Sequence, residues 1–306
     1  MDAVGMNGRG TILVTGASGF TGRHACSYFD SIGMKVAALV RKAGDTPEYG
    51  ETVVCDMTVK EQVYEAIRSV RPDYVLHVAG KNSVPESWTN PIQYIETNMM
   101  STLILLDALR ELPHCRILVV GSKLKFDLAR TEKPPHPYSW SKTMQQTAAR
   151  HWMHLFEQHI MLAEPSNLIG PGPSTGICAL FASKMIRMER GYKEGPFRLS
   201  SAGEQRDFLD VRDAVRAYGF ILRAGSRGTV YPIESGIWRR LDDVIEAFQR
   251  HASKRVPVIA GNDDVRTEPV PANPALMREL GWTPQISFET SVQDIVDYYR
   301  KRQEVK

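Results

Sequence analysis

The chain has 306 residues, of which 42% are hydrophobic, so it can bury a large core as one α/β unit or as two lobes. Its 38 basic and 35 acidic residues leave a formal net charge of +3 without a long basic tract, which argues against a nucleic-acid partner. No apolar stretch approaches the roughly 20 residues that cross a bilayer, and the N-terminus lacks the pattern of a signal peptide. We therefore expect a cytoplasmic protein that binds neither nucleic acid nor membrane.

Strand and helix patterns alternate through the first half of the chain. The predicted strands are residues 11–15, 34–40, 52–55, 73–78, 116–120 and 160–163. The predicted helices are residues 20–31, 58–70, 92–111 and 138–157. Near-continuous apolar strands separated by helices predict an α/β fold with a doubly wound parallel sheet that is covered on both faces.

The alternation stops at residues 170–174, which are rich in proline and glycine. Beyond this segment the pattern predicts an amphipathic helix at about 176–190, a second helix at 240–252 and a third near 273–280. The intervening segments are short and irregular. We expect this half of the chain to form a second, smaller lobe.

The cysteines and histidines do not suggest a metal site. Cys26, Cys55, Cys115 and Cys178 are far apart in the sequence, with no Cys-x-x-Cys pair, and they are typical of small core residues in a reducing compartment. Several histidines fall between residues 136 and 159, but no third ligand or partnering carboxylate stands at a fixed spacing from them. We expect no bound metal.

A glycine-rich turn follows the first predicted strand, in the order Gly16-Ala17-Ser18-Gly19-Phe20-Thr21-Gly22. A buried strand that leads through such a turn into a helix begins a dinucleotide-binding βαβ unit, because glycine lets the backbone approach a pyrophosphate at the helix N-terminus. An ordinary strand–helix turn needs only one or two glycines. The sequence therefore predicts cofactor contacts from Gly16, Ser18, Gly19, Phe20 and Gly22.

This motif predicts a Rossmann-type domain and sets the expected domain boundaries. We expect residues 1–165 to form the dinucleotide-binding domain, with residues 208–235 returning to it. Residues 166–207 and 236–306 then form the smaller substrate-binding lobe.

Tyr138 and Lys142 are four residues apart and share one face of a predicted helix. A phenol has an ordinary pKa near 10, and a neighbouring positive charge stabilises the phenolate and lowers that pKa towards neutrality. A surface tyrosine–lysine pair is the commoner meaning of this spacing. The glycine-rich turn upstream, in the expected order, instead favours a proton-transfer pair beside a dinucleotide.

With both motifs in place, the chain resembles the extended short-chain dehydrogenase/reductases, which include nucleotide-sugar epimerases, dehydratases and reductases. The resemblance runs from about residue 10 to 300, and further segments carry it: residues 73–80, 87–102, 165–172 and 206–213. Glu164 stands where the family usually has arginine.

The resemblance implies a role for each matching residue. Ser122, Tyr138 and Lys142 would be the catalytic residues, with Ser122 bonding the substrate oxygen, Tyr138 moving the proton, and Lys142 holding the nicotinamide ribose and lowering the tyrosine pKa. Further cofactor contacts are implied for Arg41, Asp56, Met57, Ala79, Asn98 and Pro165. Substrate contacts are implied for Ser83, Lys123, Asn167 and Arg206.

The cofactor preference can be read at the end of the second strand. NAD-binding sites usually place an acid there, which bonds the ribose hydroxyls. This chain has Arg41 and Lys42 instead, and arginine can pair with a 2′-phosphate through two parallel hydrogen bonds. The sequence favours NADP(H), with NAD(H) possible, and two solvated cations remain the alternative reading.

The reaction is indicated by departures from the family. In dehydratases an acidic pair follows the catalytic serine or threonine in the sequence. In this chain Lys123 and Leu124 follow Ser122, which disfavours a 4,6-dehydratase. The segment 123–137 is also shortened against the family. We expect a reductase of a nucleotide-linked 4-keto-6-deoxyhexose, near the GDP-mannose branch, that makes a 6-deoxysugar nucleotide for glycan biosynthesis. An NAD-dependent 4-epimerase is the alternative, ahead of a non-catalytic NADP-binding sensor.

The resemblance also implies a homodimer built from helices 92–111 and 138–157 of each subunit. Leu103, Leu106, Trp152 and Phe156 could serve this interface or the core.

Overall fold

The computed structural model describes residues 10–129, 133–261 and 274–302. The chain divides into two compact units, which are taken separately below. The first lies within Met1–Pro165, Val215–Pro232 and Leu276–Trp282. The second lies within Ser166–Ala214, Ile233–Ala275 and Thr283–Lys306.

The boundaries differ in three places from those expected from the sequence. The returning segment runs from Val215 to Pro232 rather than from 208 to 235, because a strand (Gln205–Asp210) and the first residues of a helix (Val211–Ala224) stay with the second unit. The segment Leu276–Trp282, which the sequence placed in the second lobe, belongs to the first unit. It carries the short helix α10 (Ala275–Glu279), whose Met277 is buried.

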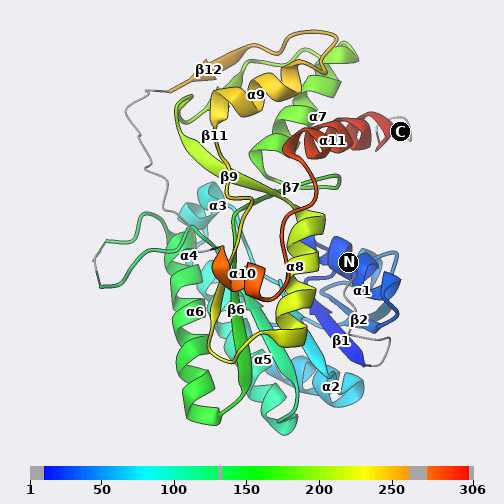
Figure 1. Cartoon of the computed structure of the whole chain (residues 1–306), viewed down its shortest axis with the longest axis vertical. Helices are drawn as coiled ribbons and strands as arrows, with labels where there is room; N and C mark the ends of the chain where they lie inside the picture. The colour runs from blue at the N-terminus through cyan, green and yellow to red at the C-terminus, as the bar shows by residue number, and fades with distance from the viewer. Residues whose placement is uncertain (1–9, 130–132, 262–273, 303–306) are drawn as a thin grey trace. The chain divides into compact units, whose positions relative to one another are not determined.

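A seven-stranded sheet in the order β10-β6-β5-β4-β1-β2-β3 forms the centre of the first unit (Figure 1). Its strands are β1 (Thr11–Thr15), β2 (Lys35–Val40), β3 (Glu51–Val54), β4 (Tyr74–His77), β5 (Arg116–Val120), β6 (His159–Pro165) and β10 (Val230–Ile233). All pairings from β3 to β6 are parallel. The chain order reverses between β1 and β4, which is the switch point where doubly wound sheets bind their ligands. The predicted Rossmann-type fold is confirmed.

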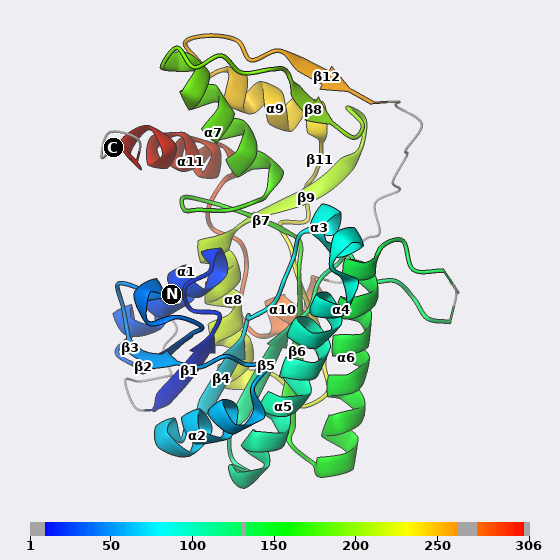
Figure 2. The ribbon, with the colours of Figure 1, turned by 180° about the vertical axis from the view of Figure 1, so that it is seen from behind.

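Helices cover both faces of this sheet (Figure 2). On one face lie α2 (Lys60–Val70), α5 (Ser101–Ala108) and α6 (Pro137–Phe156), and they share a core with alternate strand residues such as Leu13 and Val119. The other face carries α1 (Phe20–Ser31) and α8 (Val211–Ala224), where Gly219 of α8 packs against the Tyr28 ring of α1. Both strand faces are apolar because both are buried.

The predicted helix 92–111 is not one regular α-helix. It consists of α4 (Pro91–Tyr94), a π-helical turn η2 (Ile95–Met100), α5 and a 3-10 turn η3 (Leu109–Glu111). It is preceded by the short helix α3 (Val84–Thr89), which the sequence analysis did not predict. Single π-helical turns inside helices are rare and often lie at functional sites.

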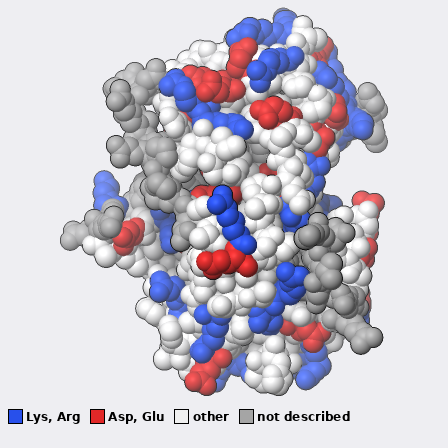
Figure 3. Space-filling model, viewed as in Figure 1, with Lys and Arg blue, Asp and Glu red and all other residues white. Residues whose placement is uncertain are grey.

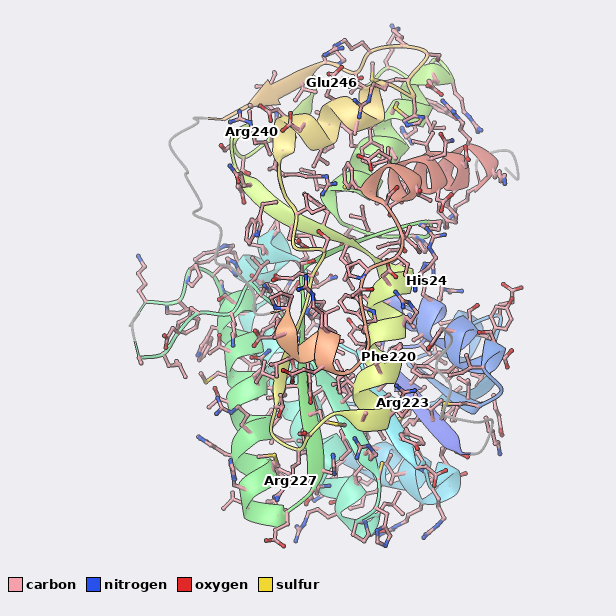
Figure 4. The ribbon with its side chains drawn as sticks, viewed as in Figure 1. His24, Phe220, Arg223, Arg227, Arg240 and Glu246 are labelled. Carbon is pink, nitrogen blue, oxygen red and sulfur yellow. The ribbon has the colours of Figure 1, made fainter. Side chains whose placement is uncertain are left out.

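Arginine side chains attach the returning segment to the rest of the first unit. Arg116 of β5 donates to the carbonyl oxygens of Leu222 (2.6 Å) and Gly225 (2.7 Å) at the end of α8. Arg227 donates to the Met153 carbonyl oxygen at 2.7 Å, near the end of α6 (Figure 4). These charge-assisted hydrogen bonds join segments that lie far apart in the sequence.

The second unit is built on a three-stranded sheet in the order β11-β9-β7 and a parallel pair, β8 and β12. The strands are β7 (Asn167–Ile169), β8 (Phe197–Leu199), β9 (Gln205–Asp210), β11 (Trp238–Arg240) and β12 (Val258–Ala260). The helices α7 (Ile177–Glu189), α9 (Leu241–Gln249) and α11 (Phe288–Arg302) pack around one core. The sequence analysis predicted α7 and α9 but neither α11 nor these strands.

The described residues also bear on membrane and metal binding. None of their helices has the length and apolar character of a membrane span, and none of their His, Cys, Asp and Glu side chains gather in threes as metal ligands would. On the face shown in Figure 3, cationic and anionic side chains are interspersed rather than segregated.

Candidate active site

The glycine-rich turn between β1 and α1 has the backbone geometry of a phosphate cradle. Gly16 has φ +66°, and a Cβ atom on Gly22 would lie 2.1 Å from the Gly16 carbonyl oxygen, so neither position can carry a side chain without displacing the turn. A Cβ atom on Gly16 would also lie 2.8 Å from the Cα atom of Ala79, at the end of β4. Gly19 caps α1 without a side-chain hydrogen bond, so the first turn of the helix, which begins at Phe20, offers its backbone N–H groups to an anion. These residues fit a dinucleotide pyrophosphate.

Asp56 and Arg41 lie together at the adjoining edge of the sheet. The Asp56 carboxylate accepts hydrogen bonds from the Thr58 amide (3.0 Å) and hydroxyl (2.7 Å), and these bonds hold the pKa of Asp56 below its ordinary value, with a smaller contribution from the Arg41 charge. Arg41 itself is exposed, whereas the neighbouring Met57 is buried. Arg41 and Asp56 are therefore close enough for their charges to interact.

Tyr138 lies in the first turn of α6, and the helix start is fixed by local contacts. The His136 ring caps the helix, with Nδ1 accepting from the Ser139 amide at 2.9 Å, and Pro137 occupies the first helical position. The His136 ring also stacks on the Tyr138 ring, with their centroids 5.9 Å apart. The Tyr94 ring packs edge-on against Tyr138, with a centroid distance of 6.3 Å. These two rings restrict the orientation of the Tyr138 phenol.

Ser122 lies where the sequence analysis expected it, at the end of β5 and within hydrogen-bond reach of Tyr138. Its hydroxyl also accepts from the Leu124 amide at 3.1 Å. The preceding Gly121 has no room for a side chain, because a Cβ atom there would lie 1.7 Å from Nε2 of the buried Gln146 on α6. This close approach brings the end of β5 against the helix that carries Tyr138.

Lys142 is only 6% exposed, and its Nζ donates to the Val120 carbonyl oxygen at 2.8 Å. Burial lowers the pKa of Lys142 to about 7. Burial also raises the pKa of Tyr138, and the hydrogen bond with Ser122 opposes that rise. Burial rather than the Lys142 charge is therefore the largest influence on the pKa of Tyr138 in this structure, and the role of Lys142 stays a prediction.

Asn98 links the π-helical turn to α6. Its Nδ2 donates to the Ser141 hydroxyl (2.9 Å) and the Lys81 carbonyl oxygen (3.0 Å), and its Oδ1 accepts from the Lys81 amide (2.8 Å). Ser141 in turn donates to the Tyr138 carbonyl oxygen at 2.8 Å. Asn98 thus positions the segment before α3 relative to the catalytic helix. The sequence analysis singled out Asn98 but neither Ser141 nor His136, because neither residue belongs to a motif.

A buried polar network continues behind these residues. The His77 ring bonds the Thr15 hydroxyl and the Thr102 hydroxyl, each at 2.8 Å, and Gln145 of α6 donates to Thr102 at 2.9 Å. Burial lowers the pKa of His77 to about 3, so this ring is neutral at physiological pH. The network connects β1, β4, α5 and α6 at the carboxyl edge of the sheet.

The residues expected to contact substrate are divided between the two units. Ser83 caps α3 through its hydroxyl, which accepts from the Glu86 amide at 3.3 Å, and Lys123 lies in the turn after β5. Asn167 and Arg206 belong to the second unit, where Asn167 donates to the Asp207 carbonyl oxygen (2.9 Å). Arg206 donates to the Glu204 carboxylate at 2.7 Å. Pro165 ends β6 in the first unit.

Replacement of Lys142 by methionine should raise stability. Because the pKa of Lys142 is lower in the folded chain than in the unfolded one, the protonated lysine destabilises the fold. This loss of folding free energy is greatest below about pH 7 and shrinks as the pH rises towards the ordinary lysine pKa. One pKa unit corresponds to about 1.4 kcal/mol, and Lys142→Met should stabilise the chain by about 2–4 kcal/mol at pH 7 and by less at pH 9.5. Urea unfolding at both pH values measures this change. Lys35→Met, at an exposed ion pair, is the control, and a loss of stability in Lys142→Met at pH 7 would contradict the prediction.

Known proteins share the sequence pattern of this chain along most of its length. The sequence model of the NAD dependent epimerase/dehydratase family matches residues 12–233. The GDP-6-deoxy-D-mannose reductase of Pseudomonas aeruginosa is 26% identical over 307 residues, which cover 95% of this chain and 97% of that protein. The dTDP-glucose 4,6-dehydratase of Haemophilus influenzae is 25% identical over 338 residues, which cover 94% and 97% of the two chains.

Solved structures agree with the fold. The structure of RMD from Pseudomonas aeruginosa complexed with NADPH has a TM-score of 0.79 and 26% identity, covering 96% of this chain and 100% of that chain. The UDP-glucose 4-epimerase of Thermus thermophilus, in complex with NAD, has a TM-score of 0.81 at 23% identity, covering 95% and 99%. The expected family is confirmed: the chain belongs to the NAD dependent epimerase/dehydratase family and is an NAD(P)-dependent oxidoreductase.

Proposed function

We propose that this protein is a nucleotide-sugar 4-ketoreductase, which uses a reduced nicotinamide to convert a nucleotide-linked 4-keto-6-deoxyhexose into a 6-deoxysugar nucleotide. The observation that carries this proposal is the contact of Ser122 with Tyr138, with Lys142 one helical turn further along α6. A ketone reduction needs only a hydride, a proton donor and a hydrogen bond to the carbonyl oxygen. The similarity to GDP-6-deoxy-D-mannose reductase supports the same reaction class.

The surroundings of Ser122 argue against dehydration. Elimination of water needs an acid or base beside the reacting carbon, and the two residues after Ser122 are Lys123 and Leu124. Two carboxylates lie further along the chain, Asp127 in the turn after β5 and Glu164 in β6, and both have other partners. Asp127 accepts from the Ala129 amide at 2.9 Å, and Glu164 pairs with Lys125.

In the proposed ketone reduction, each catalytic residue has a separate role. A bound reduced nicotinamide would supply the hydride for the carbonyl carbon. Tyr138 donates the phenol proton to the carbonyl oxygen, so the ketone becomes an alcohol, and Ser122 donates a hydrogen bond that positions the same oxygen. Lys142 stabilises the phenolate that remains on Tyr138, which requires the charged form of the lysine. The polar contacts of α6 keep these three side chains in register.

We also infer roles for the remaining residues of the site. Asn167 and Arg206 would contact the substrate, with the Arg206 guanidinium bonding the diphosphate once it leaves Glu204. Ser83 and Lys123 would contact the sugar. Asp56 would bond the adenine amino group, and Arg41 would bond a ribose 2′-phosphate.

The first experiment incubates the purified protein with NADPH or NADH and a panel of nucleotide-linked 4-keto-6-deoxyhexoses. Loss of absorbance at the reduced nicotinamide band with one nucleotide class is the expected result. Tyr138→Phe should lower kcat by at least about a hundredfold with cofactor affinity kept, because general acid catalysis contributes on the order of 10²–10⁴. Tyr192→Phe, at an exposed tyrosine of the second unit, is the matched control. Interconversion of unmodified sugar nucleotides without added cofactor would instead establish the epimerase.

Arg41 should set the cofactor preference. A charge-assisted hydrogen bond contributes about 1.5–3 kcal/mol, so Arg41→Ser should lower kcat/KM for NADPH about ten- to a hundredfold and leave the value for NADH almost unchanged. Arg41→Lys keeps the positive charge but loses the planar guanidinium, so its kcat/KM for NADPH should lie between those of the wild type and of Arg41→Ser. Equal losses with both cofactors would remove Arg41 from the 2′-phosphate site.

We propose a homodimer through the helices of residues 91–111 and α6. Leu106 is fully buried in the core of one chain and cannot serve an interface, whereas Leu155 of α6 is 72% exposed. Trp152 and Phe156 are half-buried and pack together at 4.5 Å. Sedimentation equilibrium should give twice the subunit mass of 34.4 kDa. Leu155→Glu should shift the protein towards monomer and Leu180→Glu on α7 should not; a wild-type monomer would refute the dimer.

A further inference from the structure

Two unusual features of the sequence contact each other in the structure. Glu164 stands where the family resemblance leads us to expect arginine, and Lys125 belongs to the segment between β5 and α6 that the same resemblance leads us to expect to be longer. The Lys125 ammonium forms an ion pair with the Glu164 carboxylate. The Glu164 side chain is only 12% exposed and that of Lys125 is 39% exposed, so the carboxylate depends on this lysine for its charge compensation.

The ion pair lies beside the end of β5. Val120 of β5 pairs with Ala163 of β6, and the Gly121 amide donates to the Ala163 carbonyl oxygen at 2.8 Å. Glu164 is the next residue of β6, level with the point where the chain leaves β5. Figure 2 shows the segment between β5 and α6 leaving the sheet at the end where α6 begins.

A second contact attaches the same segment to α6. The Phe126 amide donates to the Thr143 hydroxyl at 3.1 Å, and Thr143 is buried immediately after Lys142. Neighbouring residues, Lys125 and Phe126, are therefore fixed to two different elements, β6 and α6. Ser122, Lys123 and Leu124 are the three residues between these attachments and Gly121, which bonds Ala163.

This short span determines where the Ser122 hydroxyl lies. The Ser122 hydroxyl accepts a hydrogen bond from the Leu124 amide, within the same three residues, and also bonds the Tyr138 side chain on α6. A three-residue turn that is held at both ends has little freedom, so a release of Lys125 would let Ser122 move away from Tyr138. A displacement of about 1 Å in such a site can cost about a hundredfold in rate.

We propose that Lys125 and Glu164 are positioning residues: their ion pair holds the turn 122–126 so that Ser122 stays against Tyr138. The proposal rests on the proposed function in one respect, namely that Ser122 and Tyr138 act on the substrate oxygen.

The test uses charge removal and charge exchange in the full chain. Glu164→Gln and Lys125→Met should each lower kcat about ten- to a hundredfold, with KM and the cofactor Kd changed less than about threefold. The double variant Lys125→Glu with Glu164→Lys should recover most of kcat, and Lys125→Arg should keep it. Lys35→Met, which removes the lysine of an exposed pair with Glu51, should have no effect. A double variant no better than the single ones would overturn the proposal, as would unchanged kcat in both single variants.

Hydrogen exchange tests the same contact without any substrate. Amide exchange at Leu124 and Phe126, followed by mass spectrometry of peptides from residues 122–129, should speed up at least about tenfold in Glu164→Gln and return in the exchanged double variant. Peptides from α7 in the second unit should not change. Failure of the ketoreductase assay with this exchange pattern would refute the proposed function alone. Unchanged exchange in Glu164→Gln would refute the positioning role whatever the reaction is.

Discussion

The site depends on the burial of a polar helix face. Tyr138, Ser141, Lys142, Gln145 and Gln146 all point from α6 into the first unit and are almost inaccessible to water. Buried polar groups need partners, and those of Tyr138, Ser141, Lys142 and Gln145 come from the end of β5, from the π-helical turn and from α5. The polar requirement of one helix therefore determines how β5, β4 and residues 91–111 are arranged around the candidate active site. A fully apolar helix would pack as well on the sheet but would specify none of these contacts.

Much of the first unit could be predicted because its elements are repeated and buried. The strands 11–15 and 116–120 and the helix 20–31 begin and end where the sequence places them, since long apolar runs and glycine turns mark both boundaries. The second unit could not be predicted to the same degree. Its strands β7, β8, β11 and β12 have three residues each, too few to show an alternating pattern. They form only because a core of distant residues supports them.

The site shows the same division between local and tertiary information. Gly16, Tyr138 and Lys142 belong to motifs whose spacing reflects local backbone geometry, and they could be named from the sequence. Ser122 could be named only through the family resemblance. The cap by His136 and the ion pair of Lys125 with Glu164 depend on which segments the fold brings together. The pKa of Tyr138 could not be predicted either, because it follows from the depth of burial rather than from the neighbouring lysine.

The π-helical turn at residues 95–100 changes which residues share a face of this helix. Such a turn holds one residue more than the α-helical path, so α4 and α5 are out of phase by one residue, or about 100° around the axis. Asn98 and Thr102 both reach polar partners across the change of phase. Deletion of one residue between Tyr94 and Asn98 would give a regular helix and turn the Asn98 and Thr102 side chains together by about 100° relative to α4. The extra residue therefore lets α4 and these two polar side chains face their separate partners at once.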